Sequence, residues 1–392
     1  TTLHLLDPRL LEGYKKHATF NADPARASTF YTMRWGTSTA GHAAGDFAWH
    51  LDDKWHNARA EQLGVRTRSC IHRAQLLEEL VALLPEGITT FGKRFKDADE
   101  LPDGALRLRF ADGTTAVAAA IVGCDGIKSR VREIVCPAAQ PTYTRECAYR
   151  AIVSRADAET ALGADMVLNG QIYCGHGAYI ITYPIEDGDF INMVAILHDQ
   201  GNAQEWPQDE WTVPAATTEI VQRFSGWHCP LIDVISRYAL PSKWAMFHLQ
   251  HDALYYHRRI CLVGDSAHAT TPHLGAGAGM AMEDAYILSN LIAFAGSVDA
   301  INTAFHAYDE VRRPRTQECI QRSLRATYGY GFSLPYAGDD VAVLKQHLEE
   351  SFRWLWHADL EAQLKSAKTI MAAENSTRPR ERFGETNPYQ RY

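Results

Sequence analysis

The spacing of apolar residues along the chain predicts several separate helices. Between His72 and Leu84 apolar residues recur three or four positions apart, and Pro85–Gly87 then ends the predicted helix. A short helical start is expected at Asp7–Tyr14, while the rest of residues 1–70 shows no regular period. The same helical spacing appears in four later segments: 215–224, 279–295, 301–325 and 341–356.

Alternating apolar and polar residues predict strands in two regions. The first is a hairpin around a turn at Ala111–Gly113, with strands over Leu106–Phe110 and Thr114–Gly123. After its two threonines the second strand is a continuous apolar run, so we expect it to be buried. In the second region short strands follow one another and indicate an antiparallel sheet: 147–153, 171–173, 179–183 and 190–197.

After this sheet, a buried strand is expected at Arg259–Gly264 and is followed by helices. A strand followed by helices is typical of an α/β domain. We therefore expect an α/β fold, with a Rossmann-like domain that is interrupted by an antiparallel-sheet domain. The expected divisions are the two parts of the α/β domain, the sheet-rich insert between them, and a C-terminal helical segment whose tail after Asn375 is loose. In chain order these are residues 1–140, 141–252, 253–330 and 331–392.

Composition narrows the class of protein. A chain of 392 residues suffices for two domains, and a net charge of −8 argues against binding of nucleic acid. No apolar run is long enough to cross a bilayer. The eight cysteines include no Cys-x-x-Cys pair, so no metal site is expected, and they fit a reducing compartment such as the cytoplasm.

The most informative string begins with the strand Ile260–Val263, which ends in Gly264-Asp265. A glycine-rich loop follows at 272–279 and leads directly into a helix. Glycines let the backbone approach a flat ligand, and the helix start offers free N–H groups to a group that becomes negative. Asp265 is placed to accept hydrogen bonds from sugar-like hydroxyls. The alternative is a plain strand–turn–helix, which the length of the ordered string disfavours. The candidate cofactor-binding residues are Gly264, Asp265, Pro272, Gly275, Ala276, Gly277 and Ala278.

A second string, Gly123–Arg132, has the same form. A buried strand ends in Asp125-Gly126, and a helix begins shortly afterwards. The alternative interpretation is a turn in which the side chains of Asp125 and Ser129 cap that helix.

Together the two strings resemble those of the single-component FAD-dependent aromatic monooxygenases. In that family the string matched by Gly123–Arg132 touches both FAD and the nicotinamide cofactor, and the string matched by Gly264-Asp265 binds the flavin ribityl chain. Ile71–Leu76 resembles the helix start that places an arginine, here Arg73, near the FAD. The resemblance therefore adds four candidate cofactor-binding residues: Arg73, Asp125, Gly126 and Arg132.

Within that family, Pro272–Ala278, Cys147–Arg150 and Phe352–Asp359 are most similar to the salicylate hydroxylases. The same framework is shared by fungal enzymes that hydroxylate and dearomatise resorcinol-type aldehydes. In those enzymes an arginine and a tyrosine of the sheet domain hold the substrate phenol, and by position they match Arg150 and Tyr183. Bacterial salicylate hydroxylases tend to carry phenylalanine in place of Tyr183, which leaves the substrate open.

The resemblance implies that NADH or NADPH reduces FAD and that O₂ then gives a flavin C4a-hydroperoxide, which hydroxylates a phenolic substrate. Arg150 is the candidate for pairing with a phenolate or carboxylate, and Tyr183 for donating to a substrate oxygen. His273 is the candidate proton shuttle. Each of the three has a purely structural alternative. Arg150 then lies at the surface or between the sheets, Tyr183 belongs to the core, and His273 bonds a backbone carbonyl. Two substrate classes remain, a salicylate-like acid that loses CO₂ or a resorcinol-type aldehyde, and the protein is expected to be a monomer or a homodimer.

The printed sequence contains no Gly-x-Gly-x-x-Gly string, although the family opens with a βαβ unit that carries one. We therefore expect the first βαβ unit, roughly 50 residues, to be missing from this sequence. That expectation also raises a third possibility, a non-catalytic remnant that binds an aromatic ligand without FAD.

Overall fold

The computed structural model describes residues 2–52, 62–64, 69–198, 206 and 210–377. Its largest element is an eight-stranded sheet in the order β13-β14-β9-β12-β11-β10-β2-β3. The antiparallel sheet expected in the middle of the chain is confirmed, with the single exception that β10 runs parallel to β2. The strands are β2 (Thr29–Trp35), β3 (Phe47–Asp52), β9 (Thr142–Ser154), β10 (Gln171–Gly175), β11 (Ala178–Ile185), β12 (Phe190–His198), β13 (Thr212–Pro214) and β14 (Ala239–His248).

Two of these strands, β2 and β3, lie in the segment that was expected to be irregular. In β2 buried and partly exposed residues do not alternate, because both of its faces pack against other parts of the chain. The sheet therefore contains strands from both sides of the domain boundary that was expected after residue 140. One face of the sheet is covered by α6 (Arg155–Leu162), α7 (Ala164–Val167), α8 (Thr217–Arg223) and α9 (Cys229–Tyr238).

The α/β part contains two small sheets. In one, β8 (Ile121–Gly123) runs parallel to β16 (Ile260–Leu262), which pairs with β15 (Tyr256–His257). The other is formed by β5 (Phe95–Glu100), β6 (Leu106–Phe110) and β7 (Thr115–Ala118). The prediction of one buried strand over 114–123 was wrong, because the hairpin strand β7 is mostly exposed and ends at Ala118. The chain then passes from the sheet of β7 to the sheet of β8. The sequence does not reveal where β7 ends, because the small apolar alanines around this point are compatible with either sheet.

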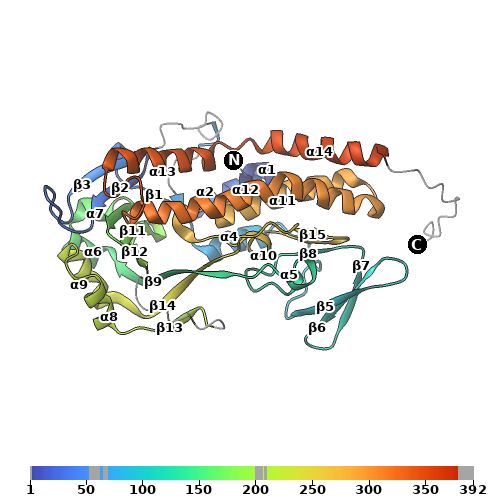
Figure 1. The fold of residues 1–392 in the computed structure, drawn as a ribbon, viewed down its shortest axis with the longest axis horizontal. Coiled ribbons are helices and arrows are strands. Elements are labelled where there is room, and N and C mark those ends of the chain that lie inside the picture. Colours follow the sequence, from blue (N-terminus) through green and yellow to red (C-terminus); the bar gives the residue numbers. More distant parts are fainter. Residues whose placement is uncertain (1, 53–61, 65–68, 199–205, 207–209, 378–392) are drawn as a thin grey trace.

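A long helix, α12 (Ile301–Tyr330), joins the two parts (Figure 1). Ala304 and Phe305 near its start pack into the core of the α/β part, while Ala326 and Tyr330 near its end pack against the large sheet. The other long helices are α11 (Gly277–Ala295), α13 (Val341–Trp356) and α14 (Leu360–Thr377). The prediction for 341–356 is confirmed. The expected loose tail begins within α14, and residues 378–392 lie outside the described part.

Short elements complete the fold. The helices are α1 (Thr2–Leu6), α2 (Pro8–His17), α4 (Arg73–Val81), α5 (Arg130–Val135) and α10 (Asp265–His268), and β1 (Thr19–Phe20) pairs with β4 (Ser69–Cys70). The helices expected near Asp7 and after His72 are thus present, and the side chain of Asp7 caps α2. Within the described residues, none of the helices has both the length and the apolarity that crossing a bilayer requires.

Candidate active site

The two strings singled out in the sequence meet at one edge of the small parallel sheet. Gly123 at the end of β8 faces Leu262 at the end of β16. The carbonyl of Gly123 accepts hydrogen bonds from the N–H of Val263 at 3.0 Å and from the hydroxyl of Ser266 at 2.7 Å. Ligands of α/β folds bind beyond the carboxyl ends of parallel strands, so this edge is where a cofactor is expected.

The Asp125-Gly126 turn is held by its own helix. The carboxylate of Asp125 accepts hydrogen bonds from the hydroxyl of Ser129 at 2.5 Å and from the N–H of Arg130 at 2.8 Å. Gly126 has φ of +79°, a conformation that favours glycine. The side chain of Asp125 thus caps the start of the helix that follows, as the alternative interpretation of Gly123–Arg132 predicted. The backbone of the turn lies beside the end of β16.

The glycine-rich loop contains both exposed and buried residues. Its buried members His273, Leu274 and Ala276 point into the protein, and Leu274 and Ala276 pack with the core beneath the large sheet. Its exposed members are Pro272, Gly275, Ala278 and Gly279. The loop is therefore anchored on one side and leaves its backbone accessible on the other.

These features fit the flavin part of FAD. Helix α11 begins at Gly277, and no side chain caps its start, so backbone N–H groups remain available to an anionic edge of a ligand. Asp265 is exposed, and a Cβ added to Gly277 would lie 4.0 Å from its carboxylate oxygen. Gly264 has φ of +64°, and a Cβ there would approach the Cβ of Ala281 to 3.1 Å. The turn at Gly264 and the glycine-rich loop thus form a surface lined by glycines, with the carboxylate of Asp265 beside it.

A buried ion pair supports this surface from below. Asp284 is fully buried and accepts hydrogen bonds from the N–H of Gly264 at 3.1 Å, from Nε2 of His268 at 2.5 Å and from Nε of Arg312 at 2.8 Å. Burial alone would raise the pKa of Asp284, but the charges of His268 and Arg312 outweigh it and lower that pKa to about 2. The sequence contained no signal for this pairing, because Arg312 follows 28 residues later.

Arg150 and Tyr183 lie on the same face of the large sheet. Val194 on β12 pairs with Arg150 on β9, and Asn192 on β12 pairs with Tyr183 on β11. Residues two positions apart on a strand share a face, so one strand separates the two side chains, which stand diagonally across it. Arg150 is exposed, and its guanidinium lies 4.9 Å from the centre of the Trp244 ring.

The other three candidates lie in different surroundings. His273 turns its ring into the protein, where Nδ1 lies 2.6 Å from the hydroxyl of Tyr179 and Nε2 lies 3.1 Å from the carboxylate of Glu146. Arg132 is buried and donates to three backbone carbonyls. Arg73 is exposed in the first turn of α4, which packs against α2. Glu146 was not singled out in the sequence, because it belongs to no motif.

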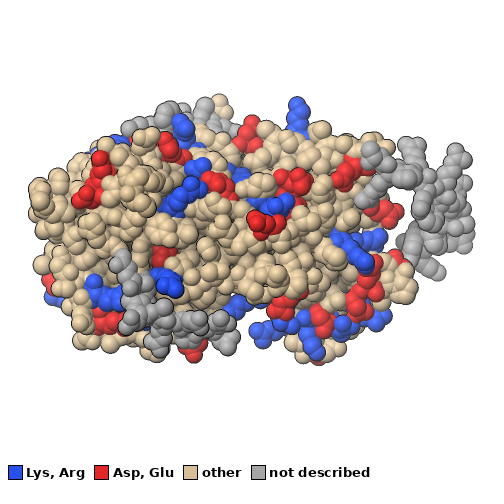
Figure 2. Space-filling view, in the orientation of Figure 1, with Lys and Arg blue, Asp and Glu red and all other residues tan. Residues whose placement is uncertain are grey.

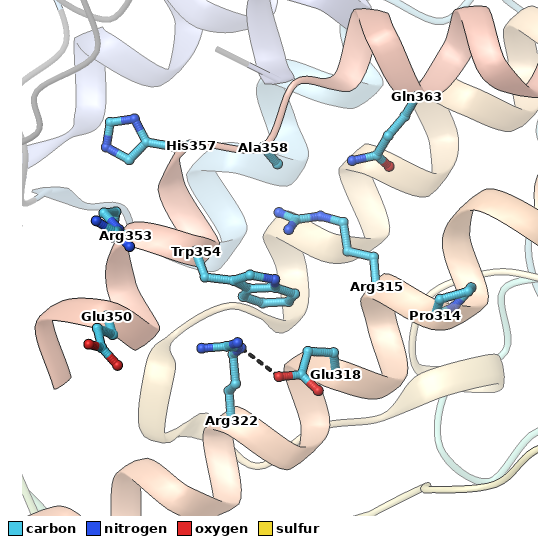
Figure 3. A pocket seen from close by; sticks show the side chains of 10 residues that line it. All are labelled: Pro314, Arg315, Glu318, Arg322, Glu350, Arg353, Trp354, His357, Ala358 and Gln363. Carbon is cyan, nitrogen blue, oxygen red and sulfur yellow. Dashed lines mark ion pairs between the residues drawn. The ribbon is translucent and has the colours of Figure 1, made fainter. Parts of the chain in front are cut away.

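A separate cleft of about 980 Å³ lies between α12, α13 and the start of α14. Figure 3 shows the indole of Trp354 between Arg315 and Arg322, whose guanidinium carbons each lie 4.7 Å from the ring centre. Arg315 also pairs with Glu283 at 2.8 Å. None of the residues lining this cleft belongs to the glycine-rich loop or to the sheet face of Arg150.

The charged side chains on the face drawn in Figure 2 are of both signs and are interspersed. No extended region of that face carries basic side chains alone, which agrees with the net charge of −8.

Comparison with known proteins identifies the family. Residues 89–323 match the family model described as "FAD binding domain". The chain is 33% identical over 377 residues to 6-methylsalicylate 1-monooxygenase atA of Aspergillus terreus, covering 94% of this chain and 81% of that protein. It is 36% identical over 322 residues to a salicylate hydroxylase of Pseudomonas putida, covering 79% of this chain and 74% of that protein.

A solved structure gives the same result. The structure of a salicylate hydroxylase substrate complex superimposes with a TM-score of 0.79 at 28% identity, covering 92% of this chain and 88% of that chain. Klebsiella pneumoniae HpxO, complexed with FAD and uric acid, shares the fold at a TM-score of 0.63 and 18% identity. The chain belongs to the FAD-binding-domain family and is a flavin-dependent aromatic monooxygenase, as the resemblance of its motifs implied.

Proposed function

We propose that this monooxygenase hydroxylates a phenolic acid of the salicylate type, with NADH or NADPH as hydride donor and O₂ as the source of oxygen. The observation that carries the proposal is the placement of Arg150 and Tyr183 on one sheet face. The same strand β9 also contacts the glycine-rich loop through Glu146. The names of the salicylate and 6-methylsalicylate enzymes that resemble the chain support this substrate class.

Each residue has a role that follows from its chemistry. The guanidinium of Arg150 suits a planar carboxylate or phenolate, and its positive charge favours the ionised and more electron-rich form of the substrate. The hydroxyl of Tyr183 donates to a substrate oxygen at the other end of the ring. Val194 and Ile181 lie between them on the same face and give the ring an apolar floor.

Bound FAD supplies hydride acceptance and the activation of O₂. One oxygen atom of O₂ enters the ring and the other leaves as water, while the nicotinamide supplies two electrons. Where the attacked carbon carries the carboxylate, CO₂ leaves as the ring regains aromaticity. The exposed loop backbone and the sheet face of Arg150 together position the ring toward the flavin.

A second candidate substrate is a resorcinol-type aldehyde. Tyr183 favours it, because a phenol oxygen without a neighbouring carboxylate gains more from a second hydrogen-bond donor. In this case Arg150 pairs with the phenolate alone, and the product retains all of the substrate's carbon.

Product mass distinguishes the two candidates. The protein, supplied with FAD and NADH in air, is incubated with salicylate or with 2,4-dihydroxybenzaldehyde, and the products are analysed by mass spectrometry. Gain of one oxygen with loss of CO₂ from salicylate supports the first proposal, and gain of one oxygen by the aldehyde supports the second. If neither compound changes the rate of NADH oxidation and neither gives a new product, both proposed substrate classes are contradicted.

A further inference from the structure

The carboxylate of Glu146 on β9 is buried beneath the glycine-rich loop, with only 2% of the residue exposed. One oxygen accepts a hydrogen bond from the hydroxyl of Thr327 at 2.7 Å and lies 3.1 Å from Nε2 of His198. The other oxygen accepts from the hydroxyl of Thr144 at 3.0 Å and lies 3.1 Å from Nε2 of His273. Four partners from four elements of the fold thus converge on one carboxylate.

These partners keep the carboxylate ionised. Burial alone would raise the pKa of Glu146, but the charge of His273 and the hydrogen bonds from His198, His273 and Thr327 outweigh burial and hold that pKa well below its ordinary value. An ionised carboxylate only accepts hydrogen bonds, so the nitrogen of His273 that faces it carries a proton.

The other ring nitrogen of His273 also has a buried partner. It lies 2.6 Å from the hydroxyl of Tyr179, whose pKa is raised well above its ordinary value by burial and by the charge of Glu146. Tyr179 therefore keeps its proton, and its hydroxyl forms a hydrogen bond with Nδ1. The ring of His273 is held in one orientation, with the N–H at Nε2 directed at the carboxylate, in the way that a buried carboxylate orients an imidazole in other sites.

Glu146 and Arg150 lie on the same face of the same strand, four residues apart. This separation is roughly 13 Å along an extended strand. At one end of this span Glu146 holds the loop through His273, and at the other end Arg150 is exposed where the proposed substrate binds. Strand β9 therefore sets the distance between the loop and the substrate-binding arginine.

We propose that Glu146 is a positioning residue: its carboxylate holds the His273 ring in one orientation, with the N–H at Nε2 facing it, and thereby fixes the glycine-rich loop at a set distance from Arg150. The inference rests on the proposed function only for the role of Arg150. Displacing a reacting group by about 1 Å lowers rates by about a hundredfold. A change at Glu146 that shifts the loop is therefore expected to lower the yield of hydroxylated product per NADH oxidised, although Glu146 itself does not touch the substrate.

Other contacts hold the loop when Glu146 is altered. The hydroxyl of Thr271 donates to Ser323 at 2.9 Å, and the hydroxyl of Ser323 donates to the carbonyl of Thr271 at 2.7 Å. Replacement of the carboxylate is therefore expected to shift the loop without unfolding it.

The test compares the full-length wild-type protein with Glu146→Gln, using histidine labelled with ¹⁵N to observe the ring tautomers by NMR. The wild type is expected to show His273 with its proton on Nε2. The carboxamide is uncharged and presents N–H groups where only acceptors stood, so the variant is expected to lose the proton on Nε2. A wild-type ring without a proton on Nε2 overturns the proposal without any variant, even if Glu146→Gln does not fold.

Two further measurements follow the position of the loop. Affinity for FAD, measured by flavin fluorescence, is expected to fall about tenfold in Glu146→Gln. The yield of hydroxylated product per NADH oxidised is expected to fall several-fold, and Glu146→Asp is expected to restore part of it. An FAD affinity and yield equal to those of the wild type would overturn the proposal.

The control is Glu219→Gln. Glu219 bonds the hydroxyl of Tyr149 at 2.9 Å and the ammonium of Lys243 at 2.8 Å, and Tyr149 belongs to the opposite face of the sheet. This variant is expected to leave the tautomer, FAD affinity and yield unchanged. If the wild type hydroxylates no phenol, the proposed function fails, but the tautomer and FAD affinity still test the role of Glu146.

Discussion

The guanidinium of Arg132 donates a hydrogen bond of 3.0 Å to the carbonyl of Ser266. It also donates to the carbonyls of Ile127 at 2.6 Å and Ala139 at 3.1 Å, and it is only 4% exposed. One buried side chain therefore joins the turn after β8 to the turn after β16, which are the two segments that the sequence motifs marked.

Replacement of Arg132 by lysine is expected to destabilise the protein by about 3 kcal/mol, because an ammonium group cannot reach three carbonyls in a fork and leaves buried acceptors without partners. Urea unfolding of the flavin-free protein measures this loss. The control is Arg130→Lys at an exposed ion pair with Glu133, which is expected to change stability by less than about 0.5 kcal/mol. Equal effects of the two replacements would contradict the role of Arg132.

The backbone at Gly264 leads to a second prediction. Its φ of +64° and ψ of −142° lie in a region open essentially to glycine alone, and a Cβ would also crowd Ala281. Gly264→Ala is expected to lower stability by about 2 kcal/mol and to weaken FAD binding. Gly279→Ala is the matched control, because Gly279 is helical and its Cβ would meet no atom within 4 Å, so the flavin-free protein should keep its stability.

The ion pair of Asp284 predicts how stability depends on pH. The pKa of this carboxyl is lowered from 3.8 to about 2 in the folded protein. Its contribution to stability is therefore complete above about pH 4 and is lost as the pH falls toward about 2. Asp284→Asn is expected to destabilise the protein by about 3–5 kcal/mol at pH 7, because Arg312 then remains buried with less compensation.

Unfolding midpoints at pH 7 and pH 3 check the prediction for Asp284. The gap between wild type and Asp284→Asn should narrow at the lower pH, since the wild type is then losing the same interaction. A gap of constant size would show that the carboxylate charge is not the source of the stability.

Arg150 predicts a dependence on substrate charge. Arg150→Met is expected to weaken binding of a salicylate-like anion by about tenfold to a hundredfold, the value of a hydrogen bond to a charged group. Binding of an uncharged phenol should change much less. Titration of the FAD-loaded protein, followed by flavin absorbance, measures both ligands. Arg155→Met removes an exposed arginine that pairs with Glu159 on α6, and should affect neither ligand.

The elements that could be predicted from the sequence are those with a local cause. Helix α13 (341–356) has apolar residues at helical spacing and the capping residue Asp340, and strand β6 is bounded by turns on both sides. Helix α14 was missed. Strands β2 and β3 pair with each other and were also missed, because β2 joins the large sheet only through β10, which is distant in sequence. Thr32 pairs with Gln171, a contact that no local pattern reveals.

The candidate site also contains some features that could be predicted from local sequence and others that could not. The glycine-rich loop and the Gly264-Asp265 turn were visible because ligand approach imposes residue types at fixed spacing. Glu146 and the partners of Asp284 were not visible, because their roles arise from side chains brought together by folding. A buried carboxylate within a strand or a helix has the same local sequence context as an exposed one.

The pairing of β2 with β10 has a consequence for any attempt to obtain the large sheet, which is proposed to bind the substrate, as a separate fragment. A fragment of residues 141–252 would lack β2 and β3 and would leave β10 as an open edge with unpaired backbone groups. The sheet face that carries Arg150 and Tyr183 is therefore not expected to fold when it is separated from the rest of the chain. A transplant into another scaffold would have to include the segment around Thr29–Asp52 as well, or the graft would pair with its neighbours and aggregate.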